Sequence, residues 1–450
     1  MKIALFVHCF LPKHFYGTEV YTYQVARSLR ERGYDVAVIT ANFQDEPPLE
    51  KLVTYYEYDG LPVYCIDKTK LHYKSIKDTY YQEEMSEVLR DILVELKPDL
   101  VHVTHLMNHT AILLDVISEL KIPTLATLTD FFGICYTSQL QAADSSLCHG
   151  PNLNRTNCIA CRLRDISKFT NGNWFYRLPA KHPWSMFSAA ILHHIWRHPR
   201  FKDTEIETTV RDIKDRPGIL GSLYANYRAV IAPTRFLADA YAANGLSVPI
   251  HVSHFGVDTS RAPKPHRNSS YPVKLAFIGQ IYPHKGADIL INAFSRLPSG
   301  SAELSVYGKE DQSPEYTERL KRMAEGQAIQ FKGTFPQSEI DTVLKDVDFL
   351  VIPSRWYENS PLVLLNALSS HTPVIVSNVA GMTEFVEDGK NGYVFERGSV
   401  DDLERVLRRI VNDPEGARKL SVTTEYHRTT SVMVDELVAL YDEVLSTQGE

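Results

Sequence analysis

Long apolar runs are absent from this 450-residue sequence, and no stretch approaches the roughly 20 consecutive apolar residues that a helix needs to span a bilayer. The opening apolar run, residues 3–10, has no small-residue cleavage site and leads into Leu11-Pro12. It is therefore interpreted as a first buried strand and not as a signal peptide. We expect a protein without membrane spans.

Cysteine and net positive charge are also scarce. Six cysteines in a chain of this size do not make the disulfide framework of a small secreted protein, so we expect a cytoplasmic location. The formal net charge of −7 argues against a general nucleic-acid binder, and no nucleic-acid partner is expected. A chain of 450 residues exceeds one typical domain, which predicts two domains with full cores.

The most informative stretch is residues 349–370, which has the pattern of a strand, a turn and a helix. Phe349–Pro353 is a continuous apolar run ended by proline, typical of a parallel strand that is covered on both faces. Ser360 is expected to cap the helix that follows, with Pro361 at its first position. The positive amino end of such a helix binds phosphate, and Glu358 just before it can accept hydrogen bonds from sugar hydroxyls. The pattern indicates a sugar nucleotide as ligand; the alternative is that Glu358 is an ordinary surface acid.

Several short motifs in this region carry a resemblance to a known family. They are Pro353-Ser354 followed by Glu358, then Pro373-Val374-Ile375, Gly381-Met382-Thr383-Glu384 and Asp388-Gly389-Lys390-Asn391-Gly392. The set resembles the donor-site signature of retaining GT-B glycosyltransferases of family four. The resemblance implies an α/β fold of the GT-B type, with two Rossmann-like domains facing a central cleft. It also implies that Glu358 contacts the donor hexose and that Asn366 stands where the family has a second Glu on the ribose.

A second donor-side segment is expected as a strand, Val273–Gly279, a loop, and a helix, Ala287–Leu297. The resemblance implies that Lys285 binds the donor diphosphate, whereas Gln280 replaces the Arg that the family usually has; the alternative for Lys285 is a solvated surface charge. The expected donor-binding residues are Gly17, Gly279, Gln280, Lys285, Glu358, Asn359, Ser360, Pro361, Leu362 and Asn366. Because Lys285 and the helix end supply positive charge, no catalytic metal is expected.

The N-terminal half begins with a βαβ pattern that is typical of a Rossmann-like domain: strand Ile3–Cys9, a helix through Tyr21–Arg32 and strand Val36–Thr40. Gly17 precedes the helix, and the resemblance implies a loop near the donor phosphates or the acceptor. The alternative is a tight turn. A further helix is expected over Tyr80–Leu96.

Polar residues end two further strands of this half. In the strand 98–105, alternation places His102 and His105 on opposite faces, so they are not a metal pair; His102 is expected in the core and His105 nearer a cleft. Thr129 ends the next strand, where many relatives carry a His beside the reacting sugar, and the resemblance allows Asp130 to take over the acceptor contact. The expected catalytic residues are Glu358, Lys285, Asp130 and His105.

Four of the six cysteines, Cys135, Cys148, Cys158 and Cys161, lie within 27 residues. Four thiolates satisfy a tetrahedral Zn²⁺, and the two-residue spacing of Cys158 and Cys161 is that of a zinc knuckle, although the longer gaps before it are not a standard pattern. A structural zinc site is therefore hypothesised. Free thiols, a disulfide and an iron–sulfur site are the alternatives.

Residues 162–202 reverse the overall charge, with eight Lys and Arg residues against one acidic residue, Asp165. The same window is rich in aromatic residues, among them Trp174, Trp184 and Trp196. This pattern suits the surface of an anionic membrane or a lipid-phosphate acceptor, and single-stranded nucleic acid would suit it as well. The alternative is a helical insertion that packs its aromatics on its own domain. We interpret the window as a peripheral contact at the inner face of the plasma membrane.

The chain is expected to divide into an N-terminal acceptor-side domain, residues 1–262 with an insertion at about 135–220, a donor domain, residues 263–427, and a helix within 428–450 that crosses back. The resemblance implies a metal-independent, retaining hexosyltransferase that uses a nucleotide-sugar donor and a glycan or lipid-linked acceptor. Cell-surface polysaccharide or glycolipid synthesis is the expected setting. The alternatives are a catalytically impaired sugar-nucleotide-binding subunit and a GT-B phosphorylase or epimerase.

Overall fold

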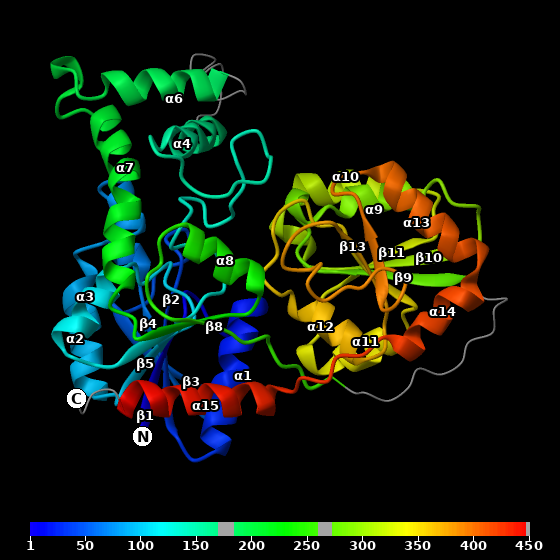
Figure 1. Ribbon diagram of the computed structural model, residues 1–450, viewed down its shortest axis with the longest axis horizontal. Helices are drawn as coiled ribbons and strands as arrows, with labels where there is room; N and C mark the ends of the chain where they lie inside the picture. Colours follow the sequence, from blue (N-terminus) through cyan, green and yellow to red (C-terminus); the bar gives the residue numbers. More distant parts are fainter. Residues whose placement is uncertain (170–183, 260–271, 447–450) are drawn as a thin grey trace. The chain divides into compact units, whose positions relative to one another are not determined.

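The computed structural model of the protein describes residues 1–169, 184–259 and 272–446 (Figure 1). The chain forms two compact units: unit 1 is Met1–Ser253 with Val434–Glu450, and unit 2 is His254–Met433. Unit 2 thus begins before the boundary expected at residue 263. Residues 260–271, which include that boundary, lie outside the described residues.

Unit 1 is built on an eight-stranded sheet with the order β3-β4-β2-β1-β5-β6-β7-β8. Its strands are β1 (Lys2–Phe6), β2 (Asp35–Ala41), β3 (Val53–Tyr58), β4 (Leu61–Ile66), β5 (Leu100–Val103), β6 (Thr124–Thr127), β7 (Ala229–Ala232) and β8 (Ile250–Val252). Neighbouring strands are parallel except in the β3/β4 hairpin, which was not expected from the sequence. The central strands β5, β6 and β7 are buried along their length, as expected for parallel strands with helices on both faces.

The described helices of unit 1 are α1 (Gly17–Glu31), α2 (Met85–Leu96), α3 (Ile112–Glu119), α4 (Thr156–Phe169), α6 (Trp184–Ile195), α7 (Glu205–Tyr224), α8 (Arg235–Ala243) and α15 (Thr430–Ser446). The helix expected from Tyr80 begins only at Met85, because the residues before it form a separate 3-10 turn, Ile76–Thr79, which Ser75 caps. Figure 1 shows α4 and α6 set apart from the helices that cover the sheet. None of the described helices combines the length and apolar content needed to cross a membrane.

The helix α15 joins unit 1 from Val434 onward. Its Tyr441 is fully buried, and the Tyr441 hydroxyl lies 2.7 Å from Nδ1 of His102 in β5. The other ring nitrogen, Nε2, lies 2.8 Å from Oγ1 of Thr127 in β6. His102 is the packed core histidine that the sequence predicted. Burial lowers the pKa of His102 to about 3, so the ring is neutral at physiological pH.

Unit 2 contains a six-stranded parallel sheet with the order β11-β10-β9-β12-β13-β14. Its strands are β9 (Val273–Ile278), β10 (Ala302–Tyr307), β11 (Ile329–Gly333), β12 (Phe349–Ile352), β13 (Val374–Ser377) and β14 (Gly392–Phe395). Its described helices are α9 (Ala287–Phe294), α10 (Pro314–Ala324), α11 (Ile340–Lys345), α12 (Leu362–Ser369), α13 (Val400–Asn412) and α14 (Pro414–Thr423). Buried aliphatic and aromatic side chains from β9, β10, β12, α9 and α13 form its core.

Each sheet has a point where the order of the strands along the chain reverses. It lies between β1 and β5 in unit 1 and between β9 and β12 in unit 2. In open parallel α/β sheets, ligands bind outside the carboxyl ends of the strands at such a point. The residues that follow these four strands are therefore the candidates for a functional site.

Candidate functional site

In unit 2, the turn after β12 brings a carboxylate and an ammonium group into contact. Nζ of Lys285, from the turn after β9, donates to Oε1 of Glu358 at 2.7 Å. The same oxygen accepts from Oγ of Ser354 at 2.7 Å and from Nε1 of Trp356 at 3.1 Å. Glu358 is buried, with 7% of its surface exposed, yet among the described residues no donor reaches its second oxygen, Oε2. One carboxylate oxygen is thus held by three donors, while the other is left for a ligand.

Two glycines let the backbone close in on this pair. Gly286 has φ of 74°, and a Cβ there would lie 2.0 Å from the carbonyl oxygen of Pro353. Gly381 has φ of 87°, and a Cβ there would lie 1.5 Å from the carbonyl oxygen of Glu358. Both conformations disfavour L side chains, and both contacts are with rigid backbone. Any larger residue would push apart the loops that hold Lys285 and Glu358.

A second ion pair supports the turn. The Arg355 guanidinium donates to both carboxylate oxygens of Asp288, at 2.7 and 2.9 Å, and the Arg355 backbone N–H donates to the carbonyl of His284 at 2.8 Å. The rings of His284 and Trp356 pack with centroids 3.7 Å apart. Burial, and secondarily the charge of Lys285, lower the pKa of His284 to about 3. The His284 ring is therefore neutral, and Lys285 is the cation of this loop.

The start of α12 differs from the expectation. The helix begins at Leu362 with Pro361 as its N-cap residue, and no side chain caps it among the described residues. Ser360 has φ of 56°, and its buried Oγ has no hydrogen-bond partner there. The prediction that Ser360 caps the helix, with Pro361 at the first helical position, is wrong, because a capping residue needs an extended backbone and Ser360 is left-handed. The amino end of α12 is accordingly left without a side-chain cap.

The other expected donor residues are placed as follows. Asn366 is buried, and its Oδ1 accepts from Oγ1 of Thr259 at 2.5 Å. Gly279 follows β9, and a Cβ there would meet only the Phe277 ring at an ordinary 3.8 Å, so packing within unit 2 does not require glycine at this position. The partly buried residues of the same loops are Gln280, Asn359, Pro361 and Leu362.

Unit 1 gathers four titratable side chains at the ends of β1, β5 and β6 and at the start of α1. Nε2 of His105 lies 3.2 Å from Oδ2 of Asp130. The His105 ring packs against that of His8 with centroids 3.9 Å apart, and Nε2 of His8 lies 3.4 Å from Oε1 of Glu19. The four side chains form a continuous row of carboxylate, imidazole, imidazole and carboxylate. The structure thus brings together His105 and Asp130, two of the expected catalytic residues, and adds His8 and Glu19. The signal that could have identified these two is their position, after a strand for His8 and at the start of a helix for Glu19.

Burial, and secondarily the charge of His105, lower the pKa of His8 well below its ordinary value. Sγ of Cys9 donates to Oε1 of Glu19 at 2.7 Å. In the described residues, His8, Cys9 and Glu19 form a group of three potential metal ligands whose ligand atoms all lie within 4.8 Å of one another. Thr129 turns its hydroxyl to the backbone, donating to the carbonyl of Thr104 at 2.8 Å. Gly17 is the first residue of α1, and a Cβ there would meet nothing within 4 Å.

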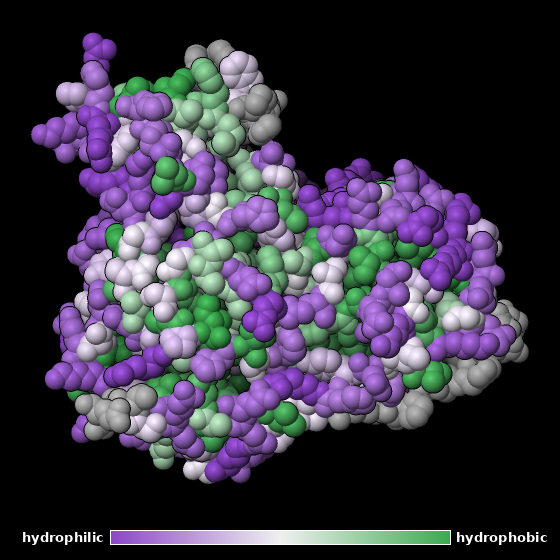
Figure 2. All heavy atoms as spheres, in the orientation of Figure 1, coloured by the Kyte–Doolittle hydropathy of each residue, from purple (hydrophilic) through white to green (hydrophobic). Residues whose placement is uncertain are grey.

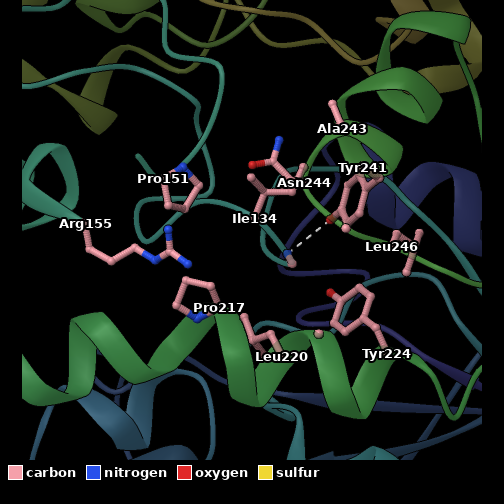
Figure 3. A pocket seen from close by; sticks show the side chains of 13 residues that line it. Ile134, Pro151, Arg155, Pro217, Leu220, Tyr224, Tyr241, Ala243, Asn244 and Leu246 are labelled. Atoms are coloured by element: carbon pink, nitrogen blue, oxygen red, sulfur yellow. Dashed lines mark hydrogen bonds between the residues drawn. The ribbon is translucent and has the colours of Figure 1, made fainter. Parts of the chain in front are cut away.

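A cavity of about 320 Å³ lies beside the Asp130 loop (Figure 3). The hydroxyl of Tyr241 donates to the carbonyl of Asp130 and accepts from the N–H of Gly133, both at 3.1 Å. Figure 3 shows Tyr224, Tyr241 and Arg155 around the opening. The lining comes from segments between residues 133 and 246, which is why no sequence motif marked it. Aromatic rings with a few polar groups are the usual lining of an organic ligand site.

The four clustered cysteines line one smaller cavity of about 10 Å³. All are free thiols, and no three of their sulfur atoms lie within 4.8 Å of one another. Burial, and secondarily the neighbouring Cys135, raise the pKa of Cys158 to about 12. The sequence cluster is therefore also a spatial cluster.

The pair Asp346 and Asp348 has the spacing of an Asp-x-Asp metal motif, which the sequence interpretation overlooked. It precedes β12, at the amino end of the strand, whereas Glu358 follows the carboxyl end. Oδ2 of Asp348 accepts from the backbone N–H of Lys274 at 2.9 Å, and Asp346 pairs with Nζ of Lys274 at 2.8 Å. These carboxylates hold the sheet and lie away from the candidate site.

The helix α6 presents an apolar face to solvent. Trp184 and Phe187 are 54% and 60% exposed, and Ile191 and Ile195 continue the same face at helical spacing. Figure 2 shows hydrophobic atoms gathered over α6. For these residues, the alternative that the insertion packs its aromatics on its own domain is wrong, although Trp196 is buried. Other aromatics of the window, including Trp174, lie outside the described residues.

Comparisons with known proteins agree with this architecture. Residues 258–426 match the family "Glycosyl transferases group 1", and residues 15–141 match the family "Glycosyltransferase Family 4". The glycogen synthase of Mycobacterium tuberculosis is 28% identical over 173 residues, which are 38% of this chain and 42% of that protein. The D-inositol 3-phosphate glycosyltransferase of Corynebacterium glutamicum is 26% identical over 186 residues, 39% of this chain and 44% of that protein. The match thus spans about two fifths of each relative.

Solved structures resemble the whole chain. Sucrose-phosphate synthase from Thermosynechococcus elongatus superposes with a TM-score of 0.62 at 14% identity, covering 99% of both chains. Anabaena HepE, solved with UDP and glucose, superposes with a TM-score of 0.61 at 14% identity, covering 98% of this chain and all of that one. At these identities the likeness establishes the fold.

Proposed function

The chain belongs to the glycosyltransferases of group 1 and family 4 and has their GT-B fold, and from this premise we propose that it transfers a hexose-type sugar from a nucleotide-sugar donor to an acceptor hydroxyl. The observation that carries the proposal is the contact between Lys285 and Glu358 at the reversal point of the unit 2 sheet. The two groups meet where such sheets bind ligands, and Oε2 of Glu358 has no protein donor among the described residues.

On the donor side, we assign the diphosphate to Lys285 and the uncapped amino end of α12. A helix end without a capping side chain has free N–H groups that stabilise phosphate, and Lys285 adds a full positive charge. Glu358 is assigned to the sugar, because Oε2 can accept from hydroxyl groups while three donors fix Oε1. This positive charge also stabilises the leaving nucleoside diphosphate, so the proposed reaction needs no divalent ion.

On the acceptor side, we assign the His105 and Asp130 pair to the incoming hydroxyl. In the proposed reaction the bond from C1 of the sugar to the diphosphate oxygen breaks, and its electrons leave with the phosphate. The acceptor oxygen bonds to C1 on the same face, and its proton passes to the departing phosphate. Retention of anomeric configuration follows from attack on that face, and no protein nucleophile is required.

The test is transfer by the full chain from UDP-, GDP- and ADP-hexoses, with UDP first because HepE was solved with it. Release of the nucleoside diphosphate measures turnover, and NMR of the anomeric proton of the product reports retention. Glu358→Gln and Lys285→Ala should each lower transfer at least about 100-fold, which equals roughly 3 kcal/mol of transition-state stabilisation. The matched control is Lys274→Ala, which removes an equally short but exposed ion pair in the same unit and should leave transfer unchanged.

Other outcomes would point elsewhere. Nucleotide binding without transfer to any acceptor would favour the binding-subunit alternative, and turnover that depends on inorganic phosphate would favour a phosphorylase. Loss of activity with EDTA that added Mg²⁺ or Mn²⁺ restores, but added Zn²⁺ does not, would contradict a metal-independent mechanism. Full activity of either site variant would refute the residue assignment.

We also propose that α6 holds the protein on an anionic bilayer, where a lipid-linked acceptor would be met. The exposed face of Trp184, Phe187 and Ile191 suits insertion at the lipid interface, and the exposed cations Arg197 and Arg200 follow the helix. A double variant with Trp184→Ser and Phe187→Ser should lose sedimentation with phosphatidylglycerol vesicles while keeping its nucleotide-induced thermal shift. Equal sedimentation of the variant and the parent would refute the proposal.

A further inference from the structure

We propose that Cys135, Cys148, Cys158 and Cys161 bind one structural zinc ion, which ties the loop after Asp130 to α4 and α7. The proposal is independent of the donor and acceptor assignments, because all four ligands lie in the insertion of unit 1. The spacing of the cysteines alone leaves zinc, free thiols, a disulfide and an iron–sulfur site open. The choice of zinc rests on the arrangement of the four thiols, on their hydrogen bonds and on Arg216.

The fold brings the four sulfurs to one place from three segments. Cys135 ends the turn after Asp130, where its backbone N–H donates to the carbonyl of Phe131 at 2.7 Å. An antiparallel β-bridge between Gln141 and Leu147 turns the chain back, so that Cys148 lines the same cavity as Cys135. Cys158 and Cys161 lie one turn apart in the first half of α4, on the side that faces the cavity.

Sγ of Cys148 has several hydrogen-bond partners, among them the carbonyl of Gly150, to which it donates at 3.4 Å. It also accepts hydrogen bonds from the backbone N–H of Gly150 at 3.4 Å and from Nδ2 of Asn157 at 3.7 Å. Donors aimed at sulfur stabilise negative charge there, as the surroundings of a metal centre commonly do. Cys158 lies in the first turn of α4 and lines the same cavity.

A buried arginine supplies the second, independent observation. Arg216 in α7 is 3% exposed, and its guanidinium lies over the rings of Tyr80 and Phe132, while no carboxylate among the described residues forms an ion pair with it. Its Nη2 donates to the carbonyl of Phe132, in the loop that leads to Cys135, while its buried Nη1 has no hydrogen-bond partner. Burial lowers the pKa of Arg216, whereas negative charge on the neighbouring Cys135 and Cys158 would raise it. A buried guanidinium without a counter-ion is costly, and an anionic centre beside it would remove that cost.

The chemistry fits one zinc ion. Four thiols that bind Zn²⁺ release four protons to solvent and leave a complex of net charge −2, which Arg216 would partly neutralise. The cavity of about 10 Å³ has room for a single small ion or a water molecule. Since no three sulfurs lie within 4.8 Å of one another, zinc binding must draw the four sulfurs closer together.

The first test is the metal content of the full chain, purified without chelators or a histidine tag, measured by inductively coupled plasma mass spectrometry. We expect about one zinc per chain, lost in Cys158→Ser and in Cys161→Ser. The matched control is Cys65→Ser, because Cys65 lies in β4, outside the cluster. This variant should retain about one zinc per chain. A UDP-induced thermal shift in each variant shows whether unit 2 remains folded, independently of any transferase activity.

Three outcomes would overturn the proposal. They are metal-free protein whose six thiols all react with Ellman's reagent under native conditions, a disulfide among the four residues detected by mass spectrometry, and iron with acid-labile sulfide in place of zinc. Because a serine variant can fail through misfolding alone, cobalt substitution of the parent chain is the second measurement. Four thiolate ligands predict d–d absorption near 700 nm, and its absence would contradict tetrahedral sulfur coordination.

Arg216 is tested as a positioning residue. Arg216→Met should weaken zinc affinity about 10–100-fold in competition with a chromophoric chelator, as loss of a supporting group around a metal typically does. Arg216→Lys should restore part of that affinity, because it restores the positive charge. Equal zinc affinity of the methionine variant and the parent would refute the charge argument.

Discussion

Replacing Lys285 by alanine tests whether its ion pair with Glu358 holds the β12 turn together. The side chains of Lys285 and Glu358 are 21% and 9% exposed. Removing one partner of a fully buried pair costs about 3–5 kcal/mol. Lys285 is partly solvated, and Ser354 and Trp356 still donate to Glu358 in the variant, so we expect about 2 kcal/mol for Lys285→Ala.

The control for this measurement is Lys274→Ala. The Lys274 and Asp346 pair has a similar distance, 2.8 Å, but its side chains are 35% and 70% exposed, so its loss should cost only about 0–1 kcal/mol. Raising the salt concentration to about 0.5 M should shrink the Lys274 effect more than the Lys285 effect, because solvent-exposed charges are screened more strongly. The comparison separates the contribution of burial from that of charge.

The assay is urea unfolding followed by circular dichroism, with hydrogen exchange of peptides around residues 280–290 and 354–360 locating the change. A double-mutant cycle with Glu358→Gln should give a coupling of about 1–2 kcal/mol. If Lys285→Ala costs no more than Lys274→Ala, the ion pair does not hold the turn, and the reasoning is refuted.

Two further predictions concern backbone space and protonation. Gly381→Ala should destabilise unit 2 by more than about 2 kcal/mol and abolish the nucleotide-induced thermal shift. The control is Gly389→Ala, which has φ of 76° but open space around it, and it should cost only about 1 kcal/mol and keep the shift. Equal effects of the two substitutions in urea unfolding would show that the contact with the Glu358 carbonyl is not the cause. His102, with a folded pKa of about 3 against 6.5 unfolded, takes up a proton only on unfolding, so stability should fall as the pH drops from 6.5 toward 3, by about 2 kcal/mol at pH 5. His102→Gln should flatten the plot of urea midpoint against pH, and an unchanged slope would contradict a neutral buried ring.

Much of the fold could be predicted because burial on both faces leaves a strong signal in the sequence. Phe349–Pro353 is a continuous apolar run, and its first four residues form the central strand β12. The β3/β4 hairpin was missed because its strand Val53–Tyr58 is partly exposed and lacks such a run. The prediction that Ser360 caps α12 failed because Ser360 has a left-handed backbone, which a capping serine does not adopt. The close approach of Gly381 to the carbonyl of Glu358, two residues earlier, accompanies this conformation.

The candidate site was predictable in position but not in pairing. Lys285 and Glu358 were each identified from their place after a strand, yet their mutual hydrogen bond depends on rotamers and on two glycine contacts that no spacing rule gives. The row from Glu19 to Asp130 joins the start of α1 to the loops after β1, β5 and β6, and the strand order puts these three loops side by side. Arg216 carried no signal, because a lone Arg in a helix is ordinarily a surface residue.

The helix α15 also affects the order in which the protein folds during synthesis. Residues 254–433, which make up unit 2, leave the ribosome before the part of α15 that belongs to unit 1. Until then β5 lacks Tyr441, the partner of His102, and the surface that Tyr441 covers stays in contact with water. The usual order, in which the amino-terminal unit is finished first, is therefore reversed, and the nascent chain must carry an incomplete first unit through the whole synthesis of the second.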